Sequence, residues 1–158
     1  MLSREHAQHT EKKMDTCVCL PTTMRRILKE RSGLKRIERA AALTACEAAD
    51  RWLHSVVDNV MLLTNENGEK TISAETVAFV TQSEDVEPRS WPFCKTRLRD
   101  AIKSRSPNFR WSLAAKVVLC NAFDDYLNLL ACRIAATQEL AGRRTISEKH
   151  VKADVNCR

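Results

Sequence analysis

Apolar residues recur at every third or fourth position along two long stretches of the chain. The first stretch runs from Ile37 to about Asn65, and the second begins at Trp111 and continues to Ile134. This spacing predicts two amphipathic helices, each of about 28 residues and about 42 Å long at a rise of 1.5 Å per residue. The apolar positions are Ile37, Ala41, Ala45, Ala48, Trp52, Val56, Val60 and Leu63 in the first helix, and Trp111, Ala115, Val118, Ala122, Tyr126, Leu130 and Ile134 in the second.

Each long helix is flanked by two shorter predicted helices. Residues 22–32 and 96–106 form a short basic helix in each half, and Gly33 and Pro107 interrupt it. Ser73 and Ser147 stand at expected N-cap positions of a third short helix. The predicted fold is therefore all-α, with the order short, long, short occurring twice.

The two halves are related by a shift of 74 residues without a gap. The segment that starts at Thr23 aligns with the one that starts at Arg97, and GEKTISAETV at Gly68 aligns with GRRTISEKHV at Gly142. We interpret the chain as a tandem duplication. It comprises an N-terminal extension (1–20), a first repeat (21–82), a linker (83–93) and a second repeat (94–158). The aligned identities include Arg25/Arg99, Lys29/Lys103, Arg36/Arg110, Cys46/Cys120, Asp50/Asp124, Thr71/Thr145 and Val77/Val151.

Neither repeat is expected to have a hydrophobic core of its own, because a long helix cannot be buried by two short ones. Two copies in one chain therefore predict an intramolecular pseudo-dimer in which one repeat crosses the other. Trp52 and Tyr126, at equivalent positions, are assigned to this shared core. The linker is polar and contains Pro88 and Pro92, and its stretch of about 12 residues could span about 40 Å if extended.

The amino-acid composition excludes several classes of protein. The chain has 158 residues with only 3 Gly and 4 Pro, too few turn-forming residues for a β-sandwich or barrel. It contains no run of about 18 apolar residues and no N-terminal stretch typical of a signal peptide. We therefore expect an intracellular protein with no membrane association.

The seven cysteines do not follow the spacing of a disulfide framework. An odd number in a chain without a secretion signal predicts free thiols in a reducing compartment. An alternative is a zinc site in which Cys17 and Cys19 join Cys94 and either His6 or His9, although C-x-C is not the common C-x-x-C spacing.

The formal net charge of +6 is unevenly distributed. Residues 1–88 hold 12 basic and 14 acidic side chains (−2), and residues 89–158 hold 14 and 6 (+8). The first short helix and following loop of each repeat are the most basic: residues 25–39 have seven basic against two acidic side chains, and residues 95–110 six against one. One such stretch is usually a solvated face, but two at equivalent positions favour an anionic partner.

The whole pattern resembles the histone fold, from about Pro21 to Asp154. The first repeat is similar to an H-four-type core histone in MRRILKERSGLKRI, and the second to an H-three type in WPFCKTRLRDAI and in NFRWSLAA followed by NAFDDYL. The resemblance implies two tandem histone folds in an intramolecular handshake. Fused histone doublets of this kind are known in large DNA viruses and, in simpler form, in some archaea.

The resemblance implies a protein that binds, bends and compacts duplex DNA non-specifically, without a cofactor. In the family, the first loop of one fold pairs antiparallel with the second loop of the other and faces the minor groove, where Arg36 and Arg110 match the inserted arginines. Helix N-termini and Thr side chains would contact phosphates. The implied DNA-binding residues are Arg25, Arg26, Lys35, Arg36, Lys70, Thr71, Lys95, Arg97, Arg99, Arg110, Arg143, Arg144 and Thr145.

Two features depart from the family pattern. Histones commonly pair an Arg in the second loop with an Asp in the third helix, but the matching positions hold Glu69 with Thr76 and Arg143 with His150. The patch through which two H-three-type chains associate is also changed, so self-association is expected to be more apolar or absent. That patch consists of Cys132, Ala136, Leu140 and His150.

Two functions from different classes remain open. The first is an architectural protein of a nucleosome-like particle, located in a nucleus, a viral particle or a viral factory, or on DNA in the cytoplasm. Its expected partners are duplex DNA, a second copy of the chain and a second histone doublet. The second is a histone-fold interaction subunit of a transcription, centromere or repair complex. The sequence has no paired nucleophile and base, phosphate-binding loop or H-E-x-x-H motif, so an enzyme is not expected.

Overall fold

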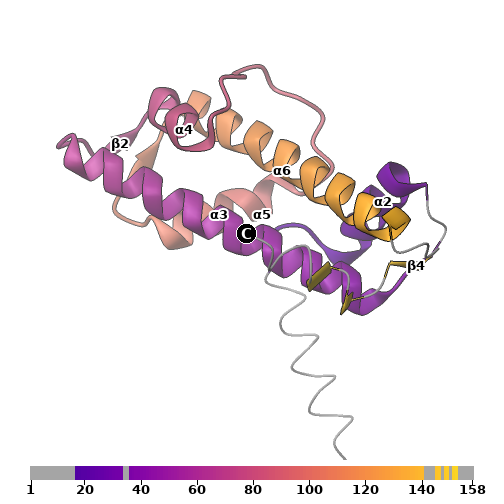
Figure 1. Cartoon of the computed structure of the whole chain (residues 1–158). Helices are drawn as coiled ribbons and strands as arrows, with labels where there is room; N and C mark the ends of the chain where they lie inside the picture. The colour runs from indigo at the N-terminus through magenta and orange to yellow at the C-terminus, as the bar shows by residue number, and fades with distance from the viewer. Residues whose placement is uncertain (1–16, 34–35, 141–144, 147, 150, 153–158) are drawn as a thin grey trace, which may run out of the picture. The chain divides into compact units, whose positions relative to one another are not determined.

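The computed structural model describes residues 17–33, 36–140, 145, 146, 148, 149, 151 and 152, which are mostly helical (Figure 1). The two long helices each have 28 residues, as the sequence pattern predicts. Residues 148, 149, 151 and 152 are also helical. The helices are α2 (Pro21–Ser32), α3 (Arg39–Glu66), α4 (Ala74–Thr81), α5 (Lys95–Arg105) and α6 (Leu113–Leu140), and the strands are β1 (Arg36–Ile37), β2 (Thr71–Ile72), β3 (Arg110–Trp111) and β4 (Thr145–Ile146).

The chain divides into two compact units, which do not coincide with the sequence repeats. The terminal unit consists of Met1–Asp50 and Asn128–Arg158, and the central unit of Arg51–Leu127. Helix α3 begins in the terminal unit and ends in the central unit, whereas α6 does the reverse. Each unit therefore combines segments of both repeats. Within the described residues, no helix has the length and apolar character needed to cross a lipid bilayer.

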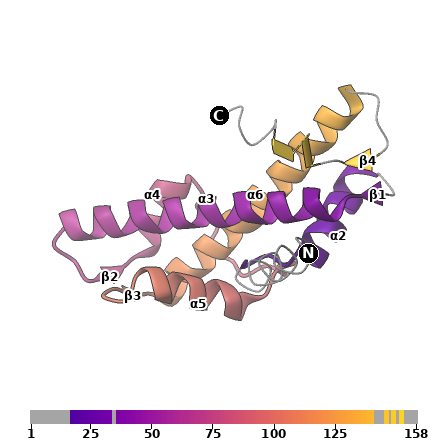
Figure 2. The ribbon, with the colours of Figure 1, turned by 90° about the horizontal axis from the view of Figure 1, so that it is seen from below.

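Each unit contains one pair of short strands. In the central unit β2 pairs with β3, and the two lie side by side in both ribbon views (Figures 1 and 2). In the terminal unit β1 pairs with β4. Both pairs are parallel, so the expected antiparallel pairing is wrong. In the central unit, each strand leads directly into a helix, β2 into α4 and β3 into α6. The two strands run in the same direction, so the first turns of both helices follow the paired loops at the same end.

The long helices begin two residues later than the apolar spacing predicts. Ile37 and Trp111 lie in strands, paired with Ile146 and Ile72. The extended backbone that this pairing requires cannot be helical, so both side chains are in the apolar pattern without being in the helices. Before α6, the hydroxyl of Ser112 accepts a hydrogen bond from the Ala115 N–H at 3.1 Å, as expected for an N-cap.

Aromatic side chains form the core of the central unit. The rings of Trp52 and Tyr126 are stacked, with centroids 4.7 Å apart and planes at 10°. Phe123 is fully buried, 6.0 Å from Trp52 and 4.9 Å from the edge-on ring of Phe93. The prediction that Trp52 and Tyr126 serve core packing is confirmed. Because 52 and 126 differ by 74, equivalent residues of the two repeats contact each other here.

The linker is held against α6 rather than free to extend. The buried amide of Asn121 donates to the carbonyl oxygens of Asp85 and Glu87, both at 2.9 Å. The same amide accepts a hydrogen bond from the Trp91 indole N–H at 2.9 Å. Arg89 forms ion pairs with Asp85 (2.7 Å), Asp125 (2.7 Å) and Asp124 (3.4 Å), and it lowers the pKa of the Asp85 carboxyl.

Replacing Asn121 by alanine is expected to lower the free energy of unfolding by about 1–3 kcal/mol. The change removes the partner of two linker carbonyls and of one indole N–H, and unsatisfied polar groups cost about this much when they are partly buried. Urea denaturation followed by circular dichroism measures the loss, with Asn59→Ala, at an exposed position of α3, as the matched control. Equal stability of the two variants would show that the linker contacts contribute nothing.

Buried thiols form part of the core of the terminal unit. Cys17, Cys19 and Cys46 are buried and are not disulfide-bonded, and the Cys19 thiol donates a hydrogen bond to the Leu20 carbonyl oxygen at 3.8 Å. The Val18 N–H donates to the Asp50 carboxylate at 3.1 Å, which ties the segment before α2 to α3. Burial and the nearby Asp50 raise the pKa of Cys17 to about 12. The described cysteines are free thiols, as predicted.

The proposed zinc ligands that the structure describes belong to different units. Cys17 and Cys19 are buried in the terminal unit, whereas Cys94 is exposed at the N-cap of α5 in the central unit. His6 and His9 lie outside the described residues. No group of three or more His, Cys, Asp and Glu side chains in the described ranges is arranged to hold a metal ion.

The thiols are expected to react with iodoacetamide in a fixed order. Backbone N–H groups of Arg97 and Thr96 lower the pKa of the exposed Cys94, which raises its thiolate fraction at pH 7. Burial raises the pKa of Cys120 to about 11. Peptide mass mapping should find Cys94 modified several-fold faster than Cys132, which is also exposed, and Cys17 and Cys120 modified only after unfolding. Early modification of Cys17 would contradict its burial.

Candidate nucleic-acid interface

The paired loops of the central unit bring together three residues predicted to contact DNA. The Arg110 N–H donates to the Lys70 carbonyl oxygen at 2.9 Å, and the Ser112 N–H donates to that of Ile72 at 3.1 Å. This register places Arg110 opposite Thr71. The side chains of Lys70, Thr71 and Arg110 are exposed, while Ile72, the next residue of β2, is buried. The pairing therefore exposes two cationic side chains and a hydroxyl on a backbone that is held by strand hydrogen bonds and by the buried Ile72.

The aromatic residues beside Arg110 are partly engaged with the protein. The Lys70 ammonium lies 5.8 Å from the centroid of the Phe109 ring, within the range of a cation–π contact. The Trp111 indole N–H donates to the Ser106 hydroxyl at 2.9 Å, and Ser106 hydrogen-bonds the Ile102 carbonyl oxygen. These contacts engage both aromatic side chains with the protein, as expected of packing residues rather than of stacking platforms for bases.

Helix α4 starts directly after the β2 strand. Its N-cap is Ser73, as predicted, whose hydroxyl accepts a hydrogen bond from the Thr76 N–H at 3.3 Å and lies 3.1 Å from the Thr76 hydroxyl. Ser112 has the corresponding position before α6 and was not predicted, although a serine directly before a helical run is a typical signal. The first turns of α4 and α6 thus follow the paired loops, and the N-terminus of a helix favours anions.

Loop rigidity in the central unit does not depend on the ion pair that histones commonly use. Thr76, the residue at the position of the missing Asp, hydrogen-bonds Ser73 instead. Glu69 is exposed and its N–H donates to the Thr64 carbonyl oxygen at 3.0 Å. The other changed pair, Arg143 with His150, lies outside the described residues.

Helix α5 adds further cations to the central unit. Lys95 and Arg99 are exposed and Arg97 is half-buried. The Lys95 ammonium is 5.7 Å from the centroid of the Trp91 ring. Arg105, at the end of the same helix, is different because it forms two hydrogen bonds of 2.8 Å with the Asp58 carboxylate. Arg105 lowers the pKa of that carboxyl, and its guanidinium is already engaged.

The terminal unit contains the second loop pair. Arg36 lies opposite Thr145 and its side chain is exposed. A guanidinium nitrogen of Arg25 donates to the Ile37 carbonyl oxygen at 3.0 Å, which connects α2 to this loop. Arg25 and Arg26 are exposed, and together with Thr22, Lys29 and Glu30 they line a hollow of about 380 Å³ on α2. The predicted residues Lys35, Arg143 and Arg144 lie outside the described part of the chain.

The two loop pairs are equivalent under the shift of the sequence repeat. Arg36 pairs with Thr145 and Arg110 with Thr71; positions 36 and 110 differ by 74, as do positions 71 and 145. The same combination of an exposed arginine opposite a threonine therefore occurs once in each unit. Each loop pair joins one residue of the first repeat to one residue of the second. Sequence identity between the repeats does not by itself indicate this pairing.

Structural comparison decides the fold. The chain superimposes on the crystal structure of the histone from Methanopyrus kandleri with a TM-score of 0.69 and 19% sequence identity, over 86% of this chain and 92% of that chain. This chain has a histone fold. No protein-family model matches its sequence, and no curated protein matches it by sequence.

The histone fold gives each element a counterpart. Helices α2, α3 and α4 supply the short, long and short helices of the first repeat, and α5 and α6 supply the first two of the second. The match covers 86% of the chain. Neither repeat alone is that long, so the match includes residues of both repeats.

The predicted self-association patch of the histone fold is only partly described. Cys132 and Ala136 lie on α6 in the terminal unit and are exposed. Leu140 is the last residue of that helix, and His150 lies outside the described residues. Exposed Leu129 is on the same helix. The patch is therefore apolar where the structure describes it.

Proposed function

We propose that this protein is a tandem histone-fold doublet that binds and bends double-stranded DNA without sequence preference. The observation that carries the proposal is the equivalent pair of loops, each with an exposed arginine opposite a threonine. Two such sites in one chain suit the repeated approach of the two phosphate backbones across a minor groove. The solved structure that this chain resembles is named as a histone, which supports the same function.

Several observations support the doublet and its intramolecular pairing. The two loop pairs obey the 74-residue relation, and the stacked rings of Trp52 and Tyr126 obey it as well. A contact between equivalent residues is expected where a pseudo-two-fold axis passes through a protein. The order of an H-four-like repeat followed by an H-three-like repeat is part of this proposal.

Binding is expected to be mainly electrostatic. Lysine and arginine side chains beside the loops neutralise phosphates and release counterions, and the first turns of the following helices donate backbone N–H groups. Arg36 and Arg110 enter the minor groove, while Thr71 and Thr145 contact the adjacent phosphates. None of these contacts reads a base edge, so no sequence preference is expected.

Further assembly is part of the proposal. The patch of Cys132, Ala136, Leu140 and His150 pairs two copies of the chain, and a second histone doublet completes a nucleosome-like particle that compacts DNA. The protein then acts in a nucleus, in a viral particle or viral factory, or on DNA in the cytoplasm. The alternative, an interaction subunit of a transcription, centromere or repair complex, requires no DNA binding.

Salt-dependent DNA binding tests the proposal. The affinity of the full chain for a random-sequence duplex is measured by fluorescence anisotropy between 50 and 400 mM salt. A logarithmic slope steeper than about −4 is expected, since each phosphate contact contributes about 0.9. Nuclease protection and light scattering then measure the size of the particle. No measurable binding at 50–100 mM salt would reject the architectural role and favour the alternative.

A further inference from the structure

A groove in the central unit contains a large apolar side chain that the protein does not cover. Phe79 on α4 is 75% exposed, and Val86 in the linker is 52% exposed. The groove has a volume of about 910 Å³, and its lining includes Ala78, Val118, Glu75 and Glu84 as well as these two residues. Its space is sufficient for several side chains of a partner. Exposed aromatic surface of this kind is typical of an interaction site.

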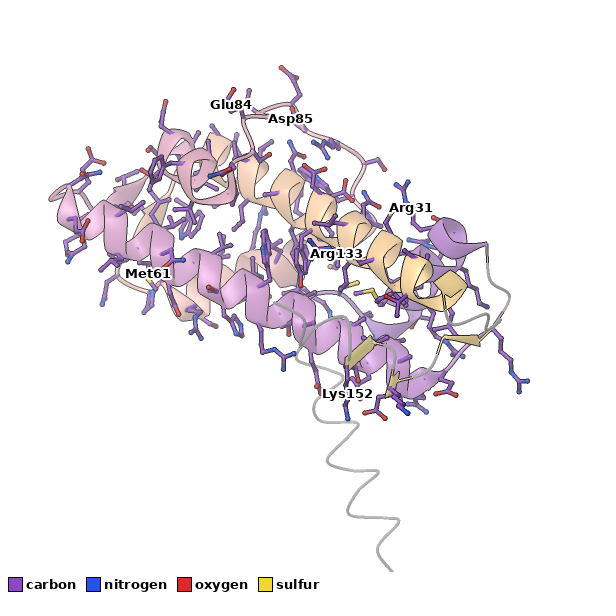
Figure 3. All side chains as sticks on the ribbon, in the orientation of Figure 1. Arg31, Met61, Glu84, Asp85, Arg133 and Lys152 are labelled. Atoms are coloured by element: carbon purple, nitrogen blue, oxygen red, sulfur yellow. The ribbon has the colours of Figure 1, made fainter. Side chains whose placement is uncertain are left out.

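The charge around the groove is opposite to that of the rest of the protein. Residues 73–87 contain four acidic side chains and no basic one, in a chain of net charge +6. Glu75 and Glu84 are exposed, and Glu84 projects from the linker next to Asp85 (Figure 3). The described residues that line the groove include no basic one. A carboxylate rim repels DNA phosphates and attracts cationic side chains.

The walls of the groove are held in place without a partner. The linker wall, which carries Glu84 and Val86, is fixed by Asn121 and Arg89 through the contacts described above. The α4 wall is fixed at its start by the Ser73 cap and packs its buried Val77 inward. A preformed groove loses little conformational entropy when it binds a ligand.

We propose that this groove binds an amphipathic helix of a basic partner protein. The apolar stripe of that helix covers Phe79 and Val86, and lysine or arginine residues beside the stripe pair with Glu75 and Glu84. A helix fits because a stripe repeating every three or four residues matches an apolar floor between two acidic edges. The proposal is independent of DNA binding, which uses the paired loops, so either can fail without the other.

Selection of peptides against the full chain tests the proposal. A phage library of 16-residue random peptides is selected on the wild type and counter-selected on Phe79→Asp. The enriched peptides are expected to be helical, with apolar residues at spacings of three and four and lysine or arginine beside them. Enrichment of acidic peptides, or no enrichment at all, would overturn the proposal.

Titration of an enriched peptide with matched variants locates the site. Phe79→Ala is expected to weaken binding by at least about 10-fold, as for a central hot spot, and Glu75→Gln with Glu84→Gln by about 3- to 10-fold with a smaller salt dependence. Leu62→Ala is the control, because Leu62 is an exposed apolar residue (58%) on α3 that does not line the groove. It should leave the affinity within about 2-fold. Unchanged affinity of Phe79→Ala would overturn the proposal. So would a concentration-dependent dimer that Phe79→Ala abolishes, because it would assign the groove to a second copy of this chain.

Discussion

Replacing Arg36 and Arg110 together by alanine is expected to weaken binding to duplex DNA by about 60-fold at 0.1 M salt. Each arginine is an exposed residue of one loop pair, so the double variant removes one proposed DNA contact from each unit. A phosphate contact contributes about 0.9 to the logarithmic salt slope. Two contacts therefore reduce the slope by about 1.8. Because 0.1 M is one decade below the 1 M reference concentration, this difference corresponds to a loss of affinity of about 60-fold. Fluorescence anisotropy across a salt series measures both quantities.

The control must lose the same charge from positions outside the loops. Arg51 and Arg133 are exposed on the two long helices, so Arg51→Ala with Arg133→Ala also lowers the net charge by two. This control should keep most of its affinity and nearly the full slope. If both double variants lose affinity equally, the protein attracts DNA only through its total charge, and the loop pairs are not the binding sites.

Replacing Phe123 by alanine is expected to lower the free energy of unfolding by about 3–5 kcal/mol. The side chain is fully buried and lies between the rings of Trp52 and Phe93. Its removal leaves a cavity at the centre of the aromatic cluster, and buried phenylalanines typically cost this much. Urea denaturation gives the free energy, and a thermal melt should show a decrease in Tm of about 10 °C.

Phe79→Ala is the matched control for this substitution. It removes the same atoms from a side chain that is 75% exposed, so the stability should change by no more than about 0.5 kcal/mol. A loss below about 1 kcal/mol for Phe123→Ala would contradict the assignment of the aromatic cluster as the core of the central unit.

The sequence predicts the helices well because their apolar periodicity is long and regular. The Gly33 end of α2 and the Ser73 cap of α4 are observed where the pattern places them. The two long helices have the predicted length of 28 residues and begin two residues later than predicted. Gly33 has φ of 66°, a left-handed conformation that glycine adopts without strain. The internal repeat also makes Trp52 and Tyr126 equivalent positions, and the stacking of their rings agrees with that equivalence.

Features that depend on tertiary pairing are not predicted correctly, or not at all. Ile37 and Trp111 satisfy the helical periodicity, but strand pairing removes them from the helices, and the parallel direction of that pairing has no local signal. The linker looks like a polar spacer because its anchor, Asn121, is 34–36 residues away. The groove beside Phe79 has no local signal either, because its lining combines α4 and the adjacent linker with Val118 of α6, which is distant in sequence.

Joining both members of each strand pair in one chain fixes their ratio. The paired positions 36 and 145 are 109 residues apart, and positions 71 and 110 are 39 apart. Two separate subunits would dissociate on dilution, whereas here each segment always has its partner at a high effective concentration. The strand pairs within one chain should therefore persist on dilution. Expression of one gene then supplies equal amounts of two complementary halves, with no excess of either.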